Sequence, residues 1–377
     1  KHDTVLIAQI YHAGRQSSKM VLGEAPQAPS AIPCPFSPDM PEELSIEEIK
    51  KIITEFGDCA LRAEKAGFDG IEVHGAHGYL ISQFMSSYTN KRTDEYGGSL
   101  QNRIRFAVEV VKDIRSKVSN EFIVGYRISA DEYVTGGRNI GDTMTIVPYL
   151  EEAGIDYIHV SAGVYRSFDD IIPSQYRGHS WNTNAASEIK KITKLPVISV
   201  GRINDPRLAE TIIASGKSDI VAMGRQSLTD PETPNKAKEG RFDEIRSCIA
   251  CHHGCVKNLL NNVPIQCILN PTLGRESEVS LEKTAAPKNI MVIGSGPAGL
   301  EAAITAASRG HRVKVFEKNR WAGGQFRIGA VPPGKGEMIN YINWQLNDLE
   351  KLNVRVLMET EVTPELVKKE KPDVVFA

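Results

Sequence analysis

Short β-branched runs alternate with amphipathic helical segments along the first two thirds of the chain, which has 377 residues. The runs that predict strands are Val5–Ile10, Gly70–His74, Phe122–Ile128, Tyr157–Ser161, Val197–Val200 and Ile220–Met223. Repeated strand–helix units predict a parallel sheet with right-handed crossovers. Because the units recur without a central switch point, they favour a (β/α)8 TIM barrel over an open α/β sheet.

The helices between these strands carry recognisable start and stop signals. Ser45 and Glu48 have the spacing of a capping box, and the helix that they open is expected to run to about Gly67. Further helices are expected over Leu100–Val118, from a cap at Asp142 to Gly154, and from Pro206 to Gly216. These segments supply the outer layer that a barrel of this class requires.

The strand count is lower than a complete barrel needs. Six strands are predicted where a TIM barrel has eight. We therefore expect the chain to be a fragment truncated at both ends, without the first two βα units and stopping inside an apolar strand at residues 372–377. A linker at residues 280–288 precedes a new βαβ unit, so the expected parts are 1–245, 246–287 and 288–377.

Bulk composition narrows the functional classes. A net charge of −2 gives no support to nucleic-acid binding, and no apolar run approaches the roughly 20 residues that span a bilayer. We expect neither nucleic acid nor membrane as a partner. Clustered cysteines in a large chain favour metal binding or catalysis over disulfides, which predicts a reducing, cytoplasmic location.

Four of the six cysteines lie close together, with the spacing C-x2-C-x3-C-x11-C. They are Cys248, Cys251, Cys255 and Cys267. Four thiolates suit an iron–sulfur cluster or a structural zinc ion. Zinc ribbons usually show two paired knuckles, so this spacing favours [4Fe–4S]. The adjacent His252 and His253 leave a mixed zinc site open, and four buried cysteines without a metal are the third reading.

A dinucleotide-binding signature follows the cysteines. Gly294, Gly296 and Gly299 form G-x-G-x-x-G between a predicted strand and a predicted helix, and Glu317 ends the next strand. Such glycines let a pyrophosphate approach a helix N-terminus, and the acid can accept a ribose hydroxyl. The alternative is a glycine-rich turn without a ligand. The signature by itself does not separate FAD from NAD.

Polar side chains follow the ends of the predicted barrel strands, where barrels place their chemistry. His74, His77 and Tyr79 combine two imidazoles with a phenol that could deliver a proton. Gly201-Arg202 and Gly224-Arg225 end the last two strands, where barrels often bind phosphate. The plain alternatives are a histidine pair packed in a loop and two surface arginines.

Several segments together resemble the old yellow enzyme superfamily. They are residues 9–15, 70–80, 90–98 and 127–130, followed by the cysteine spacing and the glycine signature. The order is similar to that of the multidomain iron–sulfur flavoenzymes, which include 2,4-dienoyl-CoA reductase, 2-enoate reductase, the bile-acid NADH:flavin oxidoreductases and trimethylamine dehydrogenase.

The resemblance implies a role for each candidate residue. It places FMN in the barrel region and FAD or ADP in the last region, with [4Fe–4S] between them. The FMN ring would contact Gln9 and Arg127, and its phosphate would contact Gly201, Arg202, Gly224 and Arg225. His74 and His77 would polarise the substrate, Tyr79 would donate a proton, and Tyr165 matches a further, variable active-site position. The four cysteines would hold the cluster, and the FAD contacts would be Gly294, Gly296, Ala298, Gly299, Glu317 and Gln325.

The implied activity is an NAD(P)H-dependent ene-reduction. Electrons would pass from NAD(P)H through FAD and the cluster to FMN, and then to an activated C=C of an enoyl-CoA, an enoate or a steroid-like enone. One alternative is an amine dehydrogenase of the trimethylamine dehydrogenase type, although that relative has a tyrosine where this chain has His74. The other alternative, from a different class, is a zinc-stabilised nucleotide-binding module without catalysis.

Overall fold

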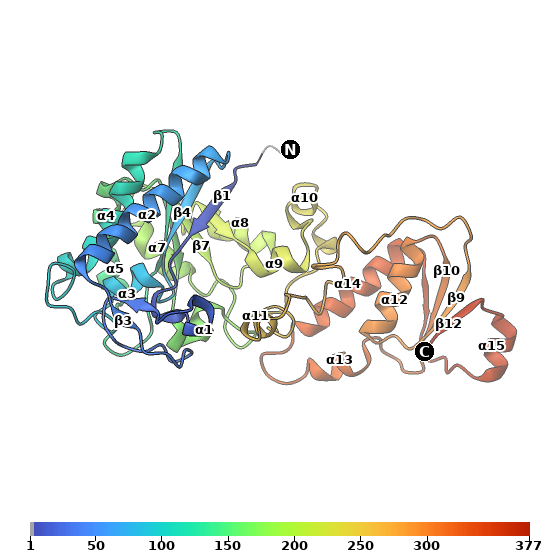
Figure 1. Cartoon of the computed structure of the whole chain (residues 1–377). Helices are drawn as coiled ribbons and strands as arrows, with labels where there is room; N and C mark the ends of the chain where they lie inside the picture. The colour runs from blue at the N-terminus through green and yellow to red at the C-terminus, as the bar shows by residue number, and fades with distance from the viewer. Residues whose placement is uncertain (1–3) are drawn as a thin grey trace. The chain divides into compact units, whose positions relative to one another are not determined.

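The computed structural model describes residues 4–377, which divide into two compact units (Figure 1). Unit 1 comprises residues up to 173, 179–203 and 207–222, and unit 2 comprises 174–178, 204–206 and 223–377. Each unit has its own sheet and its own hydrophobic core.

Unit 1 is organised around a six-stranded, curled parallel sheet with the order β1-β4-β5-β6-β7-β8. The strands are β1 (Ile7–Ile10), β4 (Gly70–Gly75), β5 (Ile123–Ser129), β6 (Tyr157–Ser161), β7 (Val197–Val200) and β8 (Ile220–Ala222). All six were predicted, to within two residues at either end. Their spatial order follows the chain, as in a TIM-like barrel. A small two-stranded sheet, β2 (Gln27–Ala28) with β3 (Glu42–Glu43), was not predicted.

Helices cover the outer face of this sheet (Figure 1). They are α2 (Ile46–Lys65), α3 (Leu80–Met85), α4 (Leu100–Lys117), α5 (Ile140–Ala153), α7 (Thr183–Lys190) and α8 (Pro206–Ala214), with the single turns α1 (Lys19–Leu22) and α6 (Phe168–Ile171). The capping box of α2 is confirmed, because Ser45 Oγ accepts a bond from the Glu48 amide and Glu48 accepts one from the Ser45 amide.

The predicted cap of α5 is wrong. Asn139 is the N-cap, and Asp142 is the third helical residue that returns the bond to the Asn139 amide. The two residues form a capping box of their own, in which asparagine takes the place of serine. The helix still ends where predicted, since Gly154 adopts a left-handed conformation with φ of 109°.

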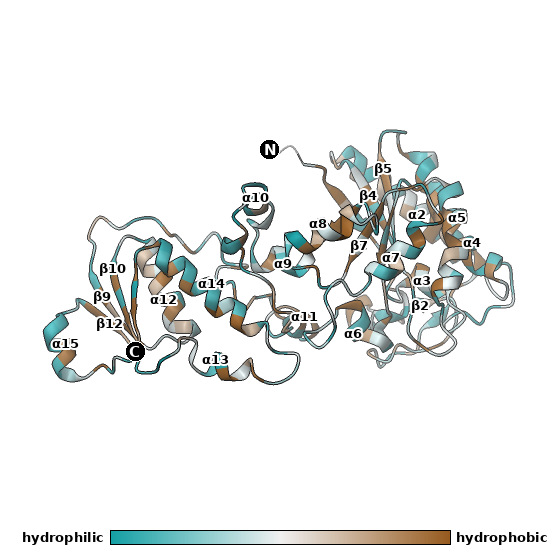
Figure 2. Cartoon of the chain, turned by 180° about the vertical axis from the view of Figure 1, so that it is seen from behind, coloured by the Kyte–Doolittle hydropathy of each residue, from teal (hydrophilic) through white to brown (hydrophobic). Residues whose placement is uncertain are grey.

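The two faces of the unit 1 strands have different chemistry. On β4, Ile71 and Val73 belong to the apolar core beneath the helices, whereas Glu72 and His74 alternate with them. Successive side chains of a strand point to opposite faces, so the second pair lines the concave face. Figure 2 shows the same mixture of apolar and polar positions along the strands. The concave face is therefore the polar one, and it holds the candidate site.

Unit 2 contains a second parallel sheet with the order β11-β10-β9-β12. Its strands are β9 (Asn289–Ile293), β10 (Arg312–Phe316), β11 (Arg355–Leu357) and β12 (Val374–Phe376). Its helices are α12 (Pro297–Ser308), α13 (Gly324–Gly329), α14 (Met338–Lys351) and α15 (Pro364–Glu370). Val313 and Val315 of β10 form a core with Leu300 of α12 and Ile342 of α14, which covers one face of the sheet.

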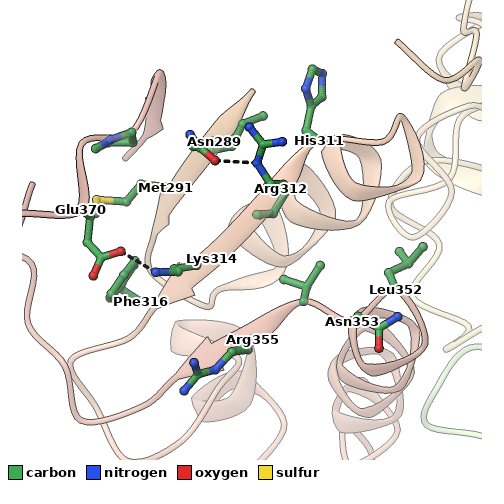
Figure 3. Close-up of a pocket in the computed structure, with 14 residues that line it drawn as sticks. Asn289, Met291, His311, Arg312, Lys314, Phe316, Leu352, Asn353, Arg355 and Glu370 are labelled. Carbon is green, nitrogen blue, oxygen red and sulfur yellow. Dashed lines mark hydrogen bonds and ion pairs between the residues drawn. The ribbon is translucent and has the colours of Figure 1, made fainter. Parts of the chain in front are cut away.

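The other face of this sheet lines a pocket of about 430 Å³ (Figure 3). Arg312 and Lys314 of β10 point into it and are held by Asn289 and Glu370. None of the glycines of the predicted nucleotide signature lines this pocket. It is therefore separate from the predicted dinucleotide site.

The cysteine segment precedes the sheet within unit 2. It follows α9 (Gly224–Thr229) and α10 (Thr233–Lys238), and it includes α11 (Val256–Leu260). Ile249 and Leu269 of this segment pack against Tyr341 of α14, and Trp344 of the same helix donates to the carbonyl of Glu244. Among residues 4–377, no helix has the length and apolar character needed to cross a membrane.

Candidate active site

Two imidazoles and a phenol meet in the turn that follows β4. His77 and Gly78 both adopt left-handed conformations, with φ of 59° and 77°, so the chain reverses sharply there. As a result the His74 ring lies 4.9 Å from the His77 ring and 4.8 Å from the Tyr79 ring, measured between centroids. The local sequence thus brings together the three groups that it predicted as candidates.

Hydrogen bonds assign the ring nitrogens of His74. The amide of Ala76 donates to His74 Nδ1 at 3.2 Å, so in the neutral ring the proton resides on Nε2. Burial, together with the positive charge of Arg127, lowers the pKa of His74 to about 3. Burial likewise places the pKa of His77 well below its usual range. Both imidazoles are therefore neutral at physiological pH, and His74 offers an Nε2–H donor.

His77 is held by residues from the two neighbouring strands. Its Nε2 lies 2.7 Å from Ser161 Oγ on β6, and its amide donates to Ser129 Oγ on β5 at 2.9 Å. A ligand would therefore have to reach this imidazole through Nδ1. Ser161 ended a predicted strand, but its role as a partner of His77 was not foreseen.

Tyr79 is paired with the fourth predicted residue, Tyr165. Their hydroxyl oxygens are 3.2 Å apart although the residues are 86 positions apart in the chain. A parallel bridge between His77 and Val164 brings the two loops together. Burial raises the pKa of Tyr79, and it raises the pKa of Tyr165 as well, so both phenols keep their protons near neutrality.

Gln9 and Arg127 lie on the same concave face. Arg127 stands in register with His74 on β4 and with His159 on β6. Its Nε atom is buried and has no hydrogen-bond partner within the described part of the chain. Gln9 donates to Glu72 at 2.5 Å. An unsatisfied guanidinium nitrogen beside two imidazoles suits the electron-rich edge of a flavin ring.

The predicted phosphate residues fall into two pairs, one in each unit. In unit 1, Gly201 and Arg202 follow β7 in left-handed conformations, with φ of 126° and 51°. A Cβ atom on Gly201 would lie 3.2 Å from the side-chain nitrogen Nδ2 of Asn182. Asn182 is buried, with 2% of the residue exposed. Both amide atoms of Asn182 lack a hydrogen-bond partner among the described residues. This buried side-chain amide beside the loop could donate a hydrogen bond to an oxyanion. We did not predict it from the sequence.

In unit 2, Gly224 and Arg225 begin α9. Arg225 Nη1 lies 2.8 Å from Nε2 of His252, which belongs to the cysteine segment. Because an arginine can only donate, His252 accepts through Nε2 and is neutral. Coordination of a metal by His252 would therefore use Nδ1 or break this bond.

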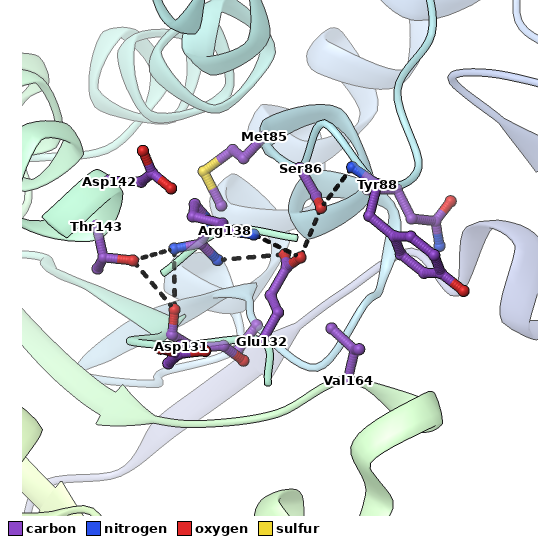
Figure 4. Close-up of polar contacts among 12 residues, drawn as sticks. Met85, Ser86, Tyr88, Asp131, Glu132, Arg138, Asp142, Thr143 and Val164 are labelled. Atoms are coloured by element: carbon purple, nitrogen blue, oxygen red, sulfur yellow. Dashed lines mark hydrogen bonds and ion pairs between the residues drawn. The ribbon is translucent and has the colours of Figure 1, made fainter. Parts of the chain in front are cut away.

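A buried ion pair braces the loop behind the candidate site (Figure 4). Glu132 and Arg138 are 1% and 2% exposed. Glu132 accepts from Ser86 Oγ at 2.5 Å and from the Arg138 amide at 3.1 Å. Arg138 donates to Thr143 Oγ1 at 2.6 Å. The backbone carbonyl of Glu132 in turn holds Ser167, which follows Tyr165 in the same turn.

All four clustered cysteines line one small cavity in unit 2. Burial raises the pKa of Cys251 to about 11 and also raises the pKa of Cys248, as expected for thiols that are surrounded mainly by apolar groups. The Ala250 amide lies 3.4 Å from Cys248 Sγ, and Thr229 Oγ1 lies 3.6 Å from Cys267 Sγ. Hydrogen bonds to sulfur of this kind are typical of iron–sulfur sites.

The four thiols lie around a small space. The cavity that they line has a volume of about 20 Å³. Within residues 4–377, no three histidine, cysteine or acidic side chains are close enough to ligate one ion. Because thiolates bind a zinc ion and the irons of a cluster alike at close range, this spacing favours neither group.

The nucleotide signature forms the turn between β9 and α12. Gly294 has φ of 95°, and a Cβ on Gly299 would overlap the Gly294 carbonyl oxygen. Gly296 has open space around it and is the N-cap of the helix, with Pro297 as the first helical residue. Ala298 lies in the first turn, and Gln325 follows Gly324, which approaches Gly296. The backbone therefore leaves room for a pyrophosphate.

Glu317 accepts more hydrogen bonds from the protein than we predicted. Its Oε2 accepts from the amide and hydroxyl of Ser295, and its Oε1 accepts from the amide and side chain of Asn319, all at 2.8 to 2.9 Å. A carboxylate has about four acceptor positions, so a ribose hydroxyl would have to replace one of these bonds. In this structure Glu317 braces the glycine turn.

Comparison with known proteins assigns the family. Residues 1–244 match the NADH:flavin oxidoreductase / NADH oxidase family, and residues 289–368 match the FAD dependent oxidoreductase family. The chain is 45% identical to an NADH oxidase of Thermoanaerobacter brockii over 98% of its length, and 38% identical to a cinnamate reductase of Clostridium sporogenes over 94%. A histamine dehydrogenase from Rhizobium sp. 4-9 superposes with a TM-score of 0.91 at 30% identity, covering 99% of this chain and 55% of that one.

The chain therefore belongs to the NADH:flavin oxidoreductase / NADH oxidase family, within the old yellow enzyme superfamily. It spans 58% and 56% of the length of the two curated relatives named above.

Proposed function

We propose that the protein containing this chain uses NAD(P)H to reduce an activated C=C bond of a small unsaturated substrate. The observation that carries the proposal is the convergence of His74, His77 and Tyr79 on one concave face. FMN, when bound at Gln9 and Arg127 with its phosphate toward Gly201 and Arg202, would supply the reducing equivalents. The supporting residues of unit 1 are the unsatisfied Arg127 Nε and the orphaned Asn182 amide.

The side chains of unit 1 would have different roles in the reaction. His74 donates through Nε2–H, and His77 donates through Nδ1–H in the tautomer whose Nε2 accepts from Ser161 Oγ. Both neutral imidazoles can then hydrogen-bond the activating carbonyl of the substrate and draw charge onto its oxygen. Tyr79 would donate its proton to the α-carbon, and its hydroxyl bond to Tyr165 holds it in place.

Unit 2 would deliver electrons to this site. We propose that Cys248, Cys251, Cys255 and Cys267 hold [4Fe–4S], and that Gly294, Gly296, Ala298, Gly299, Glu317 and Gln325 bind FAD. The support is the convergence of the four thiols on one small cavity and the glycine turn that leaves room for a pyrophosphate. On this proposal the three parts of the chain are a barrel region (1–245), a cluster segment with linker (246–287) and the start of an FAD domain (288–377). The whole protein would act in the cytoplasm.

Replacement of Tyr79 by phenylalanine tests the chemistry in the full-length protein. General acid catalysis contributes about 10²- to 10⁴-fold, so alkene reduction should slow by that factor. Reduction of the bound flavin by NADH should stay near the wild-type rate, because Tyr79 takes no part in it. Both half-reactions would be followed by anaerobic stopped-flow absorbance, with Tyr149→Phe on the outer helix α5 as the control. Equal loss of both half-reactions would contradict the proton-donor role.

An amine dehydrogenase is the second candidate, because one observation favours it. The rings of Tyr11, Tyr79, Tyr165 and Phe36 form a connected aromatic group that could hold a cation by cation–π contact. Against it, the site carries the positive charge of Arg127 and neutral imidazoles, and Glu72 is already paired. Turnover of a tertiary amine with an electron acceptor, without reduction of any activated alkene, would reverse the ranking.

A zinc-stabilised binding module is the third candidate, and metal analysis decides it. About four irons with acid-labile sulfide per chain are expected for the proposed cluster. One zinc without iron would favour the module instead.

A further inference from the structure

A buried carboxylate lies beneath the candidate flavin site and is held by three donors. Glu72 is 6% exposed on β4. Gln9 Nε2 donates to its Oε1 at 2.5 Å. Tyr157 Oη lies 3.1 Å and His159 Nδ1 lies 3.0 Å from its Oε2. No function has so far been assigned to Glu72, Tyr157 or His159. The cluster that they form therefore needs an explanation.

The strand register builds the cluster. Gln9 on β1 pairs with Glu72, Glu72 pairs with Gly125 on β5, and Gly125 pairs with Tyr157 on β6. A Cβ on Gly125 would overlap the Tyr157 ring, so only glycine lets this phenol cross β5 to reach the carboxylate. Three separate strands therefore contribute to one layer of polar side chains below His74 and Arg127.

Glu72 is an anion in this setting. Burial by itself would raise its pKa, but the hydrogen bond from His159, the positive charge of Arg127 and the hydrogen bond from Gln9 outweigh burial and hold the pKa of Glu72 at about 2. Burial lowers the pKa of His159, so this imidazole is neutral, and its Nδ1–H is the donor to Glu72. The groups that face Glu72 from the packed strands are thus one cation, Arg127, and the neutral Gln9, Tyr157, His159 and His74.

We propose that Glu72 is a positioning residue that balances the charge of Arg127 and thereby lowers the reduction potential of the flavin at this site. The inference rests on the proposed function, since it assumes that Arg127 lies at the FMN ring. A reduced flavin carries additional negative charge, which an unbalanced guanidinium would stabilise strongly. The Glu72 carboxylate weakens that stabilisation, so electrons leave the flavin more readily for the substrate. Its bond to Gln9 also orients the carboxamide, with Nε2 toward Glu72.

Glu72→Gln in the FMN-loaded, full-length protein tests the charge role. This variant keeps the shape of the side chain and removes its charge. The ratio of reduced to oxidised FMN at a fixed potential should rise by about tenfold, which is about 30 mV for a two-electron couple. Tyr157→Phe is the matched control, because it removes one donor and leaves the charge in place. Its midpoint potential, measured by spectroelectrochemistry, should move by less than about 10 mV.

The outcomes separate the two proposals. Wild-type protein that binds no FMN overturns the proposed function together with this inference. Bound FMN whose potential is unmoved or lowered in Glu72→Gln, or is raised equally in Tyr157→Phe, overturns only the role of Glu72. If Glu72→Gln does not fold, Glu72→Asp decides the question, because it keeps the charge. A potential close to that of the wild type is then expected, and a tenfold rise in the reduced fraction contradicts the charge role.

Discussion

The two units assemble their candidate sites in opposite ways. In unit 1 the site consists of side chains that are far apart in sequence, such as Glu72 with His159 and Tyr79 with Tyr165, which are 87 and 86 positions apart. In unit 2 the cysteines fall within twenty residues, and the glycines form a single turn. Unit 1 therefore depends on buried polar pairing across strands, and unit 2 depends on local backbone geometry. This difference predicts that the two units lose stability or binding through different changes.

Acid should weaken unit 1 before unit 2. Burial lowers the pKa of His74, His77 and His159 in the folded state, while an unfolded histidine titrates near 6.5. The unfolded chain therefore binds more protons, and folding stability falls as pH drops below 6.5. Each histidine that stays neutral in the folded state lowers stability by about 1.4 kcal/mol per pH unit below 6.5, so the three together lower it by about 4 kcal/mol per pH unit.

The corresponding group in unit 2 is Glu317. Burial opposes ionisation, but its four hydrogen bonds lower its pKa below 4.5, so its contribution is lost only as pH falls below that value. Hydrogen exchange between pH 7 and 4 should show amides of β4 to β6 losing protection first. Simultaneous loss in both sheets only below pH 4.5 would contradict the comparison.

Glu132→Gln should destabilise unit 1 strongly. It leaves the Arg138 charge buried without its partner, and breaking such a pair costs about 3–5 kcal/mol. Chemical denaturation, followed by hydrogen exchange in each unit, measures the effect. Glu188→Gln is the matched control, because Glu188 pairs with Lys191 at the surface and its loss should cost less than about 1 kcal/mol. A cost for Glu132→Gln as small as that of the control would show that the pair does not brace the loop.

Two glycine substitutions in unit 2 separate stability from binding. Gly299→Ala pushes a Cβ into the Gly294 carbonyl and should cost about 1–3 kcal/mol. Gly296→Ala meets no atom within 4 Å, and its φ of −68° is ordinary, so stability should change by less than about 0.5 kcal/mol. The methyl group added in Gly296→Ala would occupy the space that a pyrophosphate needs, so the affinity for FAD should fall. Calorimetry and FAD titration of both variants check this, and retained FAD affinity in Gly296→Ala would argue against the proposed pyrophosphate position.

Much of the fold could be read from local patterns. The six strands of unit 1, the capping box at Ser45 and the terminus at Gly154 were all predicted. The cap at Asp142 was misassigned because Asn139, three residues earlier, serves the same purpose. The strands β2 and β3 were missed because two-residue strands carry no periodic signal.

Candidate residues that are close together in sequence were easier to find than those that the fold brings together from distant segments. His74, His77 and Tyr79 are close in sequence, so their clustering was visible. Glu72 shares a strand face with His74, two positions away, and this alternation is the one signal that could have indicated it. Asn182 had no such signal, because its position beside Gly201 depends on how the loop after β6 folds back.

The sequence by itself determined the order of strands and helices, the cysteine spacing and the glycine turn, because each depends on residues within one or two turns of chain. Only the tertiary structure decided that Glu72 is held by donors from two other strands, that Tyr79 meets Tyr165, and that Glu317 is engaged by Ser295 and Asn319. Those contacts depend on strand register and on which side chains become buried together. Burial then sets the protonation of His74, His77 and Glu72, on which the proposed chemistry depends.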